Sequence, residues 1–143
     1  MKITSADQQL LTLLRENARA STAEIARRLK LSRTTVQSRI ERLEREGVIA
    51  GYTVRVHDAA ERSHIRAHIM ITVLPKQAAS VVEALRAMPE VRSLHSVSGP
   101  FDLVALGVTP GVAEMDALTD RIGDLEGVER TTSSIILSAK FER

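Results

Sequence analysis

Residues 31–54, LSRTTVQSRIERLEREGVIAGYTV, combine a serine, an arginine-rich stretch with a regular apolar stripe, a glycine and a β-like run. Ser32 has a side-chain oxygen that can cap a helix, and Gly47 suits the left-handed position after a helix ends. The stretch therefore predicts a helix that begins at Ser32 and runs to Glu46. The segment that follows, VIAGYTVRV, predicts a strand that forms a short hairpin arm with Gly51 at a bend.

The predicted helix has two opposed faces when its residues are placed at intervals of about 100°. Val36, Ile40 and Leu43 fall within about 60° of one another and predict contact with a core. The recognition helix of a helix-turn-helix domain places its N-terminal part in the DNA major groove, where arginine favours guanine, glutamine favours adenine and a threonine methyl can touch thymine. If the predicted helix has this role, its side chains can be assigned by their angle. The polar side chains placed to reach bases are Arg33, Thr34, Gln37 and Ser38, and those placed for phosphates are Arg39 and Arg42.

An ordinary amphipathic helix is the alternative for this stretch, because ERLERE also spaces its charges for salt bridges at i,i+3 and i,i+4. The neighbouring segments favour DNA binding. Residues 4–17 predict a first helix capped by Thr4 with Asp7 in its first turn, and STAE at 21–24 predicts a capping box that begins a second helix. Three helices, a tight turn before the third and a following strand predict a winged helix-turn-helix domain over residues 1–56.

The two halves of the chain differ in charge. Residues 1–56 hold 11 Lys/Arg and 6 Asp/Glu, a balance of +5, whereas residues 57–143 hold 9 and 12, a balance of −3. The difference agrees with double-stranded DNA as a partner of the first half alone, and chance asymmetry is the alternative. The absence of cysteine excludes disulfides and thiolate metal sites, and no apolar run approaches the roughly 20 residues of a membrane helix. We expect a cytoplasmic protein with no cofactor and no membrane partner.

The second half of the chain has a different periodicity. HDAAERSH at 57–64 is polar and aperiodic and predicts a linker, and residues 65–143 predict a second domain. IRAHIMITVL at 65–74 alternates in hydrophobicity, which predicts a strand that Pro75 ends. A helix, two strands joined at a Gly-Pro turn, a second helix and a last strand follow, with predicted ranges 76–88, 91–99, 101–109, 112–125 and 128–139.

The second domain contains an internal repeat in which each copy reads strand–helix–strand. One apolar pattern recurs 37 residues later, in the first copy as Leu85, Met88 and Val91 and in the second as Ile122, Leu125 and Val128. Two copies predict βαββαβ, a ferredoxin-like α+β fold with a four-stranded antiparallel sheet and both helices on one face. Met70 and Leu74 fall on the other face. A half-apolar sheet face predicts a homodimer that covers it.

The order STAEIARRLKLSRTTVQSRIERLEREGVIAGYTV, followed by a βαββαβ domain with VSGPFDLV, resembles the Lrp/AsnC family of bacterial and archaeal transcriptional regulators over nearly the whole chain. The resemblance implies a sequence-specific regulator rather than an enzyme. It also implies a C-terminal domain of the RAM type that dimerises through its sheet, with dimers that assemble into tetramers or octamers. One departure is Arg33, because many family members have proline after the capping serine. Arginine is a good helix former, so the departure bears on base preference rather than on the fold.

The resemblance further implies a small effector, usually an amino acid, bound between dimers near the SGxxD loop and the last strand. A carboxylate at Asp102 could hold an α-ammonium group, and glycine amides or the Ser134 hydroxyl could hold a carboxylate. The alternative for Asp102 is a turn residue that bonds nearby backbone amides. The positions that match the family pattern are Gly99, Asp102, Ser134, Ile135 and Ile136.

Other interpretations have less support. His64 and His68 stand four apart, but four strand residues span roughly 13 Å, which is too far for one metal ion. His95, Ser96, Ser98 and Asp102 include the residue types of a hydrolase triad, but neither serine lies in the GxSxG elbow of a hydrolase nucleophile. Some proteins of similar architecture are haem-pathway decarboxylases, for which the candidate residues are Arg66, His68 and His95. An architectural DNA-binding protein without an effector is the remaining alternative.

Overall fold

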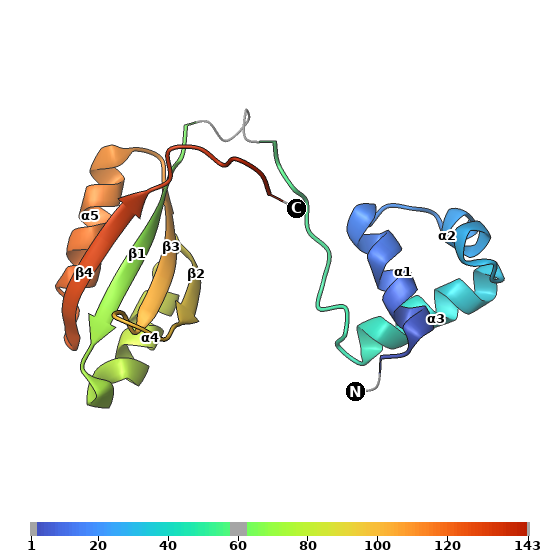
Figure 1. Cartoon of the computed structure of the whole chain (residues 1–143), viewed down its shortest axis with the longest axis horizontal. Coiled ribbons are helices and arrows are strands. Elements are labelled where there is room, and N and C mark those ends of the chain that lie inside the picture. The colour runs from blue at the N-terminus through green and yellow to red at the C-terminus, as the bar shows by residue number, and fades with distance from the viewer. Residues whose placement is uncertain (1–2, 58–62, 143) are drawn as a thin grey trace. The chain divides into compact units, whose positions relative to one another are not determined.

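The computed structural model describes residues 3–57 and 63–142. The chain divides into two compact units, Met1–Arg55 and Val56–Arg143, and each has a hydrophobic core of its own. Figure 1 shows helices in the first unit and a sheet with helices in the second. Within the predicted linker at 57–64, residues 58–62 lie outside the described residues.

The first unit consists of α1 (Ser5–Glu16), α2 (Thr22–Leu29) and α3 (Arg33–Arg45). The predicted cap residues are confirmed, since the Thr4 hydroxyl accepts from the Asp7 amide at 3.2 Å and the Ser21 hydroxyl accepts from the Glu24 amide at 3.1 Å. The capping box predicted at 21–24 is only half formed, because the described residues show no return bond from the Glu24 side chain to the Ser21 amide. Asp7 in turn accepts from the Thr4 amide at 2.9 Å, which completes a capping box at α1. The core between the helices is aliphatic and is built mainly from Leu10, Leu14, Ile25, Val36 and Leu43.

The third helix ends as its sequence predicts. Gly47 has a φ of +70°, the left-handed conformation that glycine adopts without strain. Its amide donates to the Glu44 carbonyl at 3.0 Å, and the next amide, of Val48, donates to the Leu43 carbonyl at 2.9 Å. These two bonds form a Schellman motif, which satisfies carbonyls that the helix leaves free. The C-terminal boundary of α3 is therefore set by local chemistry.

The prediction of a strand over residues 48–56 is wrong for this chain. The segment has no regular secondary structure. Val48 and Ile49 at its start pack against the core of the first unit, whereas the large apolar side chains further along are exposed, with Val54 at 82% and Tyr52 at 54%. A strand requires a neighbouring backbone to satisfy its amides and carbonyls, and none pairs with this segment in the described part of the chain. A β-like composition alone therefore did not produce a strand here.

The second unit is a four-stranded antiparallel sheet in the order β2-β3-β1-β4, as expected for βαββαβ. The strands are β1 (Ile65–Val73), β2 (Val91–Ser96), β3 (Leu103–Thr109) and β4 (Val128–Ile135). The alternation predicted for β1 is confirmed, because Ala67, Ile69 and Ile71 are fully buried while His68 between them is exposed. Strands β3 and β1 are central, and β2 and β4 form the edges.

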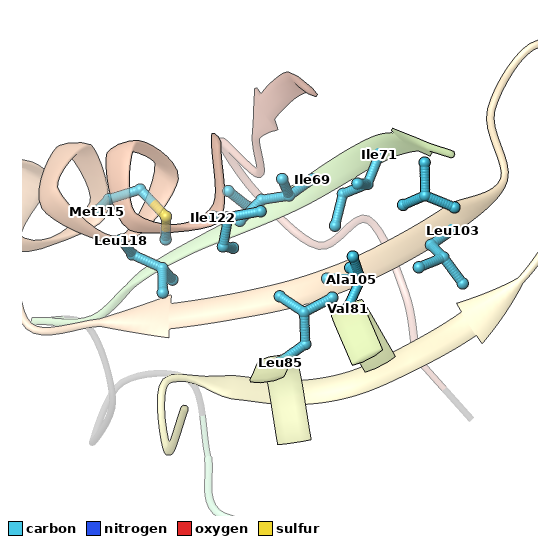
Figure 2. Close-up of a cluster of buried hydrophobic side chains, with 11 residues drawn as sticks. Ile69, Ile71, Val81, Leu85, Leu103, Ala105, Met115, Leu118 and Ile122 are labelled. Carbon is cyan, nitrogen blue, oxygen red and sulfur yellow. The ribbon is translucent and has the colours of Figure 1, made fainter. Parts of the chain in front are cut away.

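Two helices cover one face of this sheet. The first, α4 (Ala78–Arg86), follows a 3₁₀ turn at Pro75–Gln77, and the second is α5 (Val112–Gly123). Figure 2 shows side chains of both helices packed on those of β1 and β3. The predicted range 76–88 was too long at both ends, and α4 stops near the Met88–Pro89 bond because proline disfavours helical geometry in the residue before it. None of the helices among the described residues is long and apolar enough to cross a membrane.

The internal repeat is visible in the backbone hydrogen bonds as well as in the sequence. The Met88 amide donates to the Leu85 carbonyl at 3.1 Å, and the Leu125 amide donates to the Ile122 carbonyl at 3.2 Å. One step further along each copy, the amides of Val91 and Val128 donate to the carbonyls of Met88 and Leu125, both at 3.1 Å. The shared apolar pattern therefore encodes the same helix-to-strand turn twice.

The last strand is shorter than the predicted range 128–139. Strand β4 pairs with β1, and the register places Ile135 opposite Ala67 near the start of β1. The final bond of this ladder runs from the Ile136 amide to the Arg66 carbonyl at 2.8 Å. Beyond that point only Ile65 of β1 remains, and the chain leaves the sheet, where Leu137 is 94% exposed.

Candidate nucleic-acid interface

One side of α3 presents polar side chains to solvent near the start of the helix. Val36 and Leu43, on the opposite side, are fully buried in the core of the first unit. The polar set consists of four residues that are all exposed: Arg33, Thr34, Gln37 and Ser38. We call these four residues the reading face. They are the residues that the sequence predicts to contact bases, and the structure brings them together on one helix surface.

The start of α3 is held by its cap. The Ser32 hydroxyl accepts from the Thr35 amide at 3.2 Å and lies 2.7 Å from the Thr35 hydroxyl. Arg33 and Thr34 therefore occupy the first helical turn, where unpaired amides and the helix dipole favour a nearby anion. A phosphate or an electronegative base edge meets a favourable field at this end of the helix.

Arg42 has a structural partner that the sequence did not reveal. Its Nη2 lies 2.6 Å from Oδ1 of Asp7, and its Nη1 lies 3.5 Å from Oε2 of Glu46. Hydrogen bonds from the Thr4 amide and hydroxyl and from Arg42 outweigh the effect of burial and lower the pKa of Asp7 to about 2. The bond to Asp7 also raises the pKa of Arg42. Contact between Arg42 and phosphate remains a prediction.

Arg39 is half-buried, in contrast to the exposed reading face. Its Nη1 atom is inaccessible to solvent and has no hydrogen-bond partner among the described residues. The long side chain therefore packs against the unit and leaves only part of the guanidinium free to meet an anion. The predicted phosphate contact of Arg39 is not tested by this geometry and stays a prediction.

Two polar contacts of α3 were missed by the sequence analysis. Gln37 donates from Nε2 to Oε1 of Glu41 at 2.9 Å, and Tyr52 donates its hydroxyl to Oε1 of Glu44 at 2.6 Å. The second bond, with burial and the Glu44 charge, raises the pKa of Tyr52 to about 12. The i,i+4 spacing of Gln37 and Glu41 could have indicated the first bond, whereas the second depends on the path of the chain after Gly47.

Further cations lie on α2 and at the turn into α3. Arg27, Arg28 and Lys30 are exposed, and Arg28 pairs with Glu16 at 3.4 Å. Lys30 has a φ of +55° and is the one described non-glycine residue with a positive φ. This conformation costs most side chains about 1–2 kcal/mol. None of these three cations was among the residues predicted to contact DNA.

Asp102 acts in the structure as a backbone-binding residue. Its Oδ2 accepts from the Val73 amide at 2.9 Å, and its own amide donates to the Ile71 carbonyl at 3.0 Å. Asp102 is nevertheless exposed, and nearby Gly99 has a φ of +110° and open space where a Cβ would lie. The turn role that was the alternative for Asp102 is therefore present, and an effector role is not tested by this geometry.

The predicted effector residues at the end of the last strand lie at the opposite end of the sheet from Asp102. Ser134 pairs with His68 and Ile135 with Ala67, whereas Asp102 is bonded at Val73. Five residues of strand separate these positions along β1, which corresponds to roughly 16 Å. One chain therefore does not bring Asp102 and the end of β4 into a single site.

The sheet face away from the helices is apolar in its centre. Register places Met70 opposite Val104 and His68 opposite Leu106 on this face, and Val108 continues it along β3. Met70, Val104, Leu106 and Val108 are all half-buried, so a second layer could cover them further. His95 pairs with Val104 from β2, so His68 and His95 lie on the same face with β3 between them.

Two family models match the two units. A winged helix-turn-helix DNA-binding model matches residues 3–50, and an Lrp/AsnC ligand binding domain model matches residues 66–143. Among curated relatives, the HTH-type transcriptional regulator LrpA of Mycobacterium tuberculosis is 36% identical over 136 residues, which cover 94% of this chain and 90% of the relative. An uncharacterized HTH-type transcriptional regulator of Pyrococcus abyssi is 31% identical over 141 residues, and the match covers 98% of this chain and 89% of that relative.

Solved structures agree with these matches. A feast or famine regulatory protein from M. tuberculosis, complexed with L-methionine, superposes with a TM-score of 0.89 at 34% identity, covering 99% of this chain and 96% of that one. AsnC of E. coli has the same fold, with a TM-score of 0.89 at 22% identity, covering 100% of this chain and 97% of that one. These relatives are regulators by name, and the decarboxylase alternative has no support among them. The chain belongs to the Lrp/AsnC family of transcriptional regulators, with a helix-turn-helix DNA-binding domain followed by a ligand-binding domain.

Proposed function

We propose that this regulator is sequence-specific, that α3 reads the DNA major groove, and that an amino acid controls its activity. The observation that carries the first part is the reading face, in which four exposed polar side chains share the first turns of a capped helix. Such groups can discriminate base pairs in the major groove because each pair shows a different pattern of donors and acceptors there. The positive balance of residues 1–56 supplies attraction to the phosphates.

Selection from a pool of random duplexes tests sequence-specific binding. The full chain is expected to enrich one motif, with half-sites separated by whole turns of about 10 bp if two copies bind together. Replacing Gln37 with alanine should weaken binding to that motif by roughly 1–3 kcal/mol and leave random DNA almost unaffected. Enrichment of no motif, with equal affinity for all duplexes, would instead support an architectural DNA-binding protein.

An amino acid effector is supported by the ligand-binding domain and by one relative. The M. tuberculosis protein that superposes on 99% of this chain binds L-methionine in its structure. In this chain the groups suited to an amino acid are the exposed carboxylate of Asp102 and the polar and aliphatic end of β4. Because these groups lie roughly 16 Å apart along β1 in one chain, a site that uses both requires a second chain. A ligand held between chains would then favour one assembly over another.

Two substitutions of Asp102 separate its structural role from an effector role. Asp102→Asn keeps an oxygen that accepts from the Val73 amide but removes the negative charge, whereas Asp102→Ala removes both. Calorimetric titration with L-methionine and the other amino acids should show binding to the native protein and loss of binding in both variants. Equal binding of a ligand to native and Asp102→Asn protein would assign Asp102 to the turn alone.

We further propose that the apolar sheet face is a homodimer interface, as the sequence predicts, and that dimers assemble into tetramers or octamers. The face combines Met70 with three aliphatic residues of β3 and is not covered by α4 or α5. Contiguous half-buried apolar residues of this kind are typical of surfaces that a second subunit covers. A dimer would also present two reading faces to one duplex.

A further inference from the structure

We propose that Glu41 is a specificity-determining residue of the DNA interface, because it orients the Gln37 side chain for adenine and repels DNA that lacks the matching site. The proposal rests on the proposed function of α3 as the reading helix and extends it to a residue outside the reading face. Its basis is the hydrogen bond from Gln37 Nε2 to Glu41 Oε1 at 2.9 Å, between two exposed side chains one helical turn apart.

The carboxylate of Glu41 decides which way the Gln37 amide points. An ionised carboxylate only accepts hydrogen bonds, so the NH₂ group of Gln37 must face Glu41 and its oxygen must face away. Without such a partner, an exposed glutamine amide would rotate freely and could present either end to the DNA. Glu41 therefore holds the amide in one of its two orientations before DNA arrives.

The orientation that results matches one base. The NH₂ group has two N–H donors, and Glu41 uses one of them, which leaves one N–H and the Oε1 acceptor of Gln37 available. In the major groove adenine presents an N7 acceptor beside an N6 donor, and glutamine binds this pair in bidentate fashion. The bond to Glu41 is thus compatible with adenine recognition and removes part of the ordering cost that recognition would otherwise carry.

The charge of Glu41 has a second consequence. It lies about 40° around the helix from Gln37 and about 20° from Thr34, so it faces the same side as the reading face. The ion pairs within the described part of the chain do not include Glu41, so its negative charge is not neutralised by a close cation. A carboxylate at a surface that approaches phosphates costs binding energy on every duplex, and only a site that engages Gln37 compensates for it.

Five forms of the full chain separate these two effects. They are the native protein and the variants Glu41→Ala, Glu41→Gln and Gln37→Ala, and the double variant Gln37→Ala with Glu41→Ala is measured as a fifth form. Each is measured by fluorescence anisotropy on the selected motif, on the motif with single base-pair changes, and on random duplex at fixed salt. Thermal unfolding followed by circular dichroism verifies that each variant is folded, and an effect on folding alone would not change base preference.

The expected result is a loss of discrimination that depends on Gln37. Glu41→Ala should reduce discrimination at the adenine that Gln37 reads by about three- to tenfold and tighten binding to random DNA. Glu41→Gln should also tighten random binding, because the charge is gone, but should retain more of the discrimination, because it keeps an acceptor oxygen for Gln37. In the Gln37→Ala background, Glu41→Ala should change random binding and no longer change preference at that base.

Several outcomes would overturn the proposal. If Glu41→Ala alters preference at a base that Gln37→Ala leaves unchanged, Glu41 reads that base directly, as a carboxylate can do with the cytosine amino group. If the variant keeps the full discrimination of the native protein, the bond at 2.9 Å is a surface contact without a role in recognition. Failure of the native protein to select any motif would contradict the proposed function itself, which is a different result from loss of this inference alone.

Discussion

Asp7 of α1 and Arg42 of α3 form an ion pair with 2.6 Å between Oδ1 and Nη2, and the Asp7 side chain is 1% exposed. Asp7 also accepts from the amide of Thr4 at 2.9 Å and from its hydroxyl at 2.8 Å. One carboxylate therefore caps the first helix and anchors the helix that carries the reading face. Since the two residues are far apart in the sequence, this link exists only in the folded unit.

The first prediction is that Asp7→Asn destabilises the N-terminal unit by about 2–4 kcal/mol, because Arg42 loses its charged partner in a buried setting. Chemical denaturation of the full chain, followed by circular dichroism, measures the loss. Glu46→Gln is the matched control, since it removes the other carboxylate near Arg42 at an exposed position and should cost under about 1 kcal/mol. Similar losses in the two variants would contradict the anchoring role of Asp7.

The same ion pair predicts a dependence of stability on acid. The pKa of Asp7 is about 2 in the folded chain, below its ordinary value of 3.8, so folding favours the ionised form. The contribution is present above about pH 4 and is lost as the pH falls towards 2. The fall in unfolding free energy between these values should be smaller in Asp7→Asn than in the native protein, because the variant has no carboxyl group to titrate.

The second prediction concerns Tyr52, the single tyrosine of a chain without tryptophan. Its bond to Glu44 raises the pKa to about 12, so absorbance at the phenolate wavelength should rise with a midpoint near 12 rather than near 10. Folding favours the neutral phenol, so this contribution to stability is present below pH 10 and is lost as the pH rises through 12. Glu44→Ala should move the midpoint towards 10, with circular dichroism showing that both proteins stay folded. An unchanged midpoint would mean that the Tyr52–Glu44 bond does not persist in solution.

The third prediction is that Arg39→Ala weakens binding to every duplex and lowers the slope of log K against log salt by about one unit. A phosphate contact acts on all sequences alike, in contrast to the base contact proposed for Gln37. Arg86→Ala is the control, because Arg86 is an exposed arginine of the second unit that pairs with Glu83. If Arg39→Ala weakens only the selected motif, Arg39 contributes to base recognition and the phosphate assignment is incorrect.

The fourth prediction is that Lys30→Gly stabilises the N-terminal unit by about 1 kcal/mol, because glycine adopts the left-handed conformation at φ +55° without strain. Lys30→Ala provides the comparison, since it removes the charge but keeps the Cβ and should give no such gain. Denaturation midpoints of the three proteins decide between the effects. Equal stability of the glycine and alanine variants would show that the Lys30 backbone is not strained.

The fifth prediction tests the proposed dimer. Leu106→Glu places a charge at the centre of the apolar sheet face and should shift the protein towards monomers in sedimentation at micromolar concentration. Val112→Glu is the control, because Val112 is 64% exposed at the start of α5 and does not lie on that sheet. A native protein that sediments as a monomer, or a Leu106→Glu variant that keeps the native assembly, would refute dimerisation through this face.

The sequence correctly predicted the features that depend on residues close to one another in the chain. Ser32 sets the start of α3 and Gly47 sets its end, each through hydrogen bonds made within a few residues. The repeated apolar pattern of the second unit produced the same turn twice. The reading face could also be located, because helical spacing alone decides which side chains oppose Val36 and Leu43. The alternation of β1 followed from its period-two pattern, and the C-terminal βαββαβ order followed from the repeated strand–helix–strand pattern.

Features that depend on distant backbone or on a partner group were decided by the tertiary structure. The segment after Gly47 has a β-like composition but no strand, because a strand exists only where another backbone pairs with it. Arg42 could be placed on α3 from the sequence, yet its bond to Asp7 required α1 and α3 to pack together. Asp102 and Ser134 could each be named, but only the strand register shows that they lie at opposite ends of β1 in one chain. Local periodicity thus determined the elements and their faces, whereas packing and register determined which side chains meet.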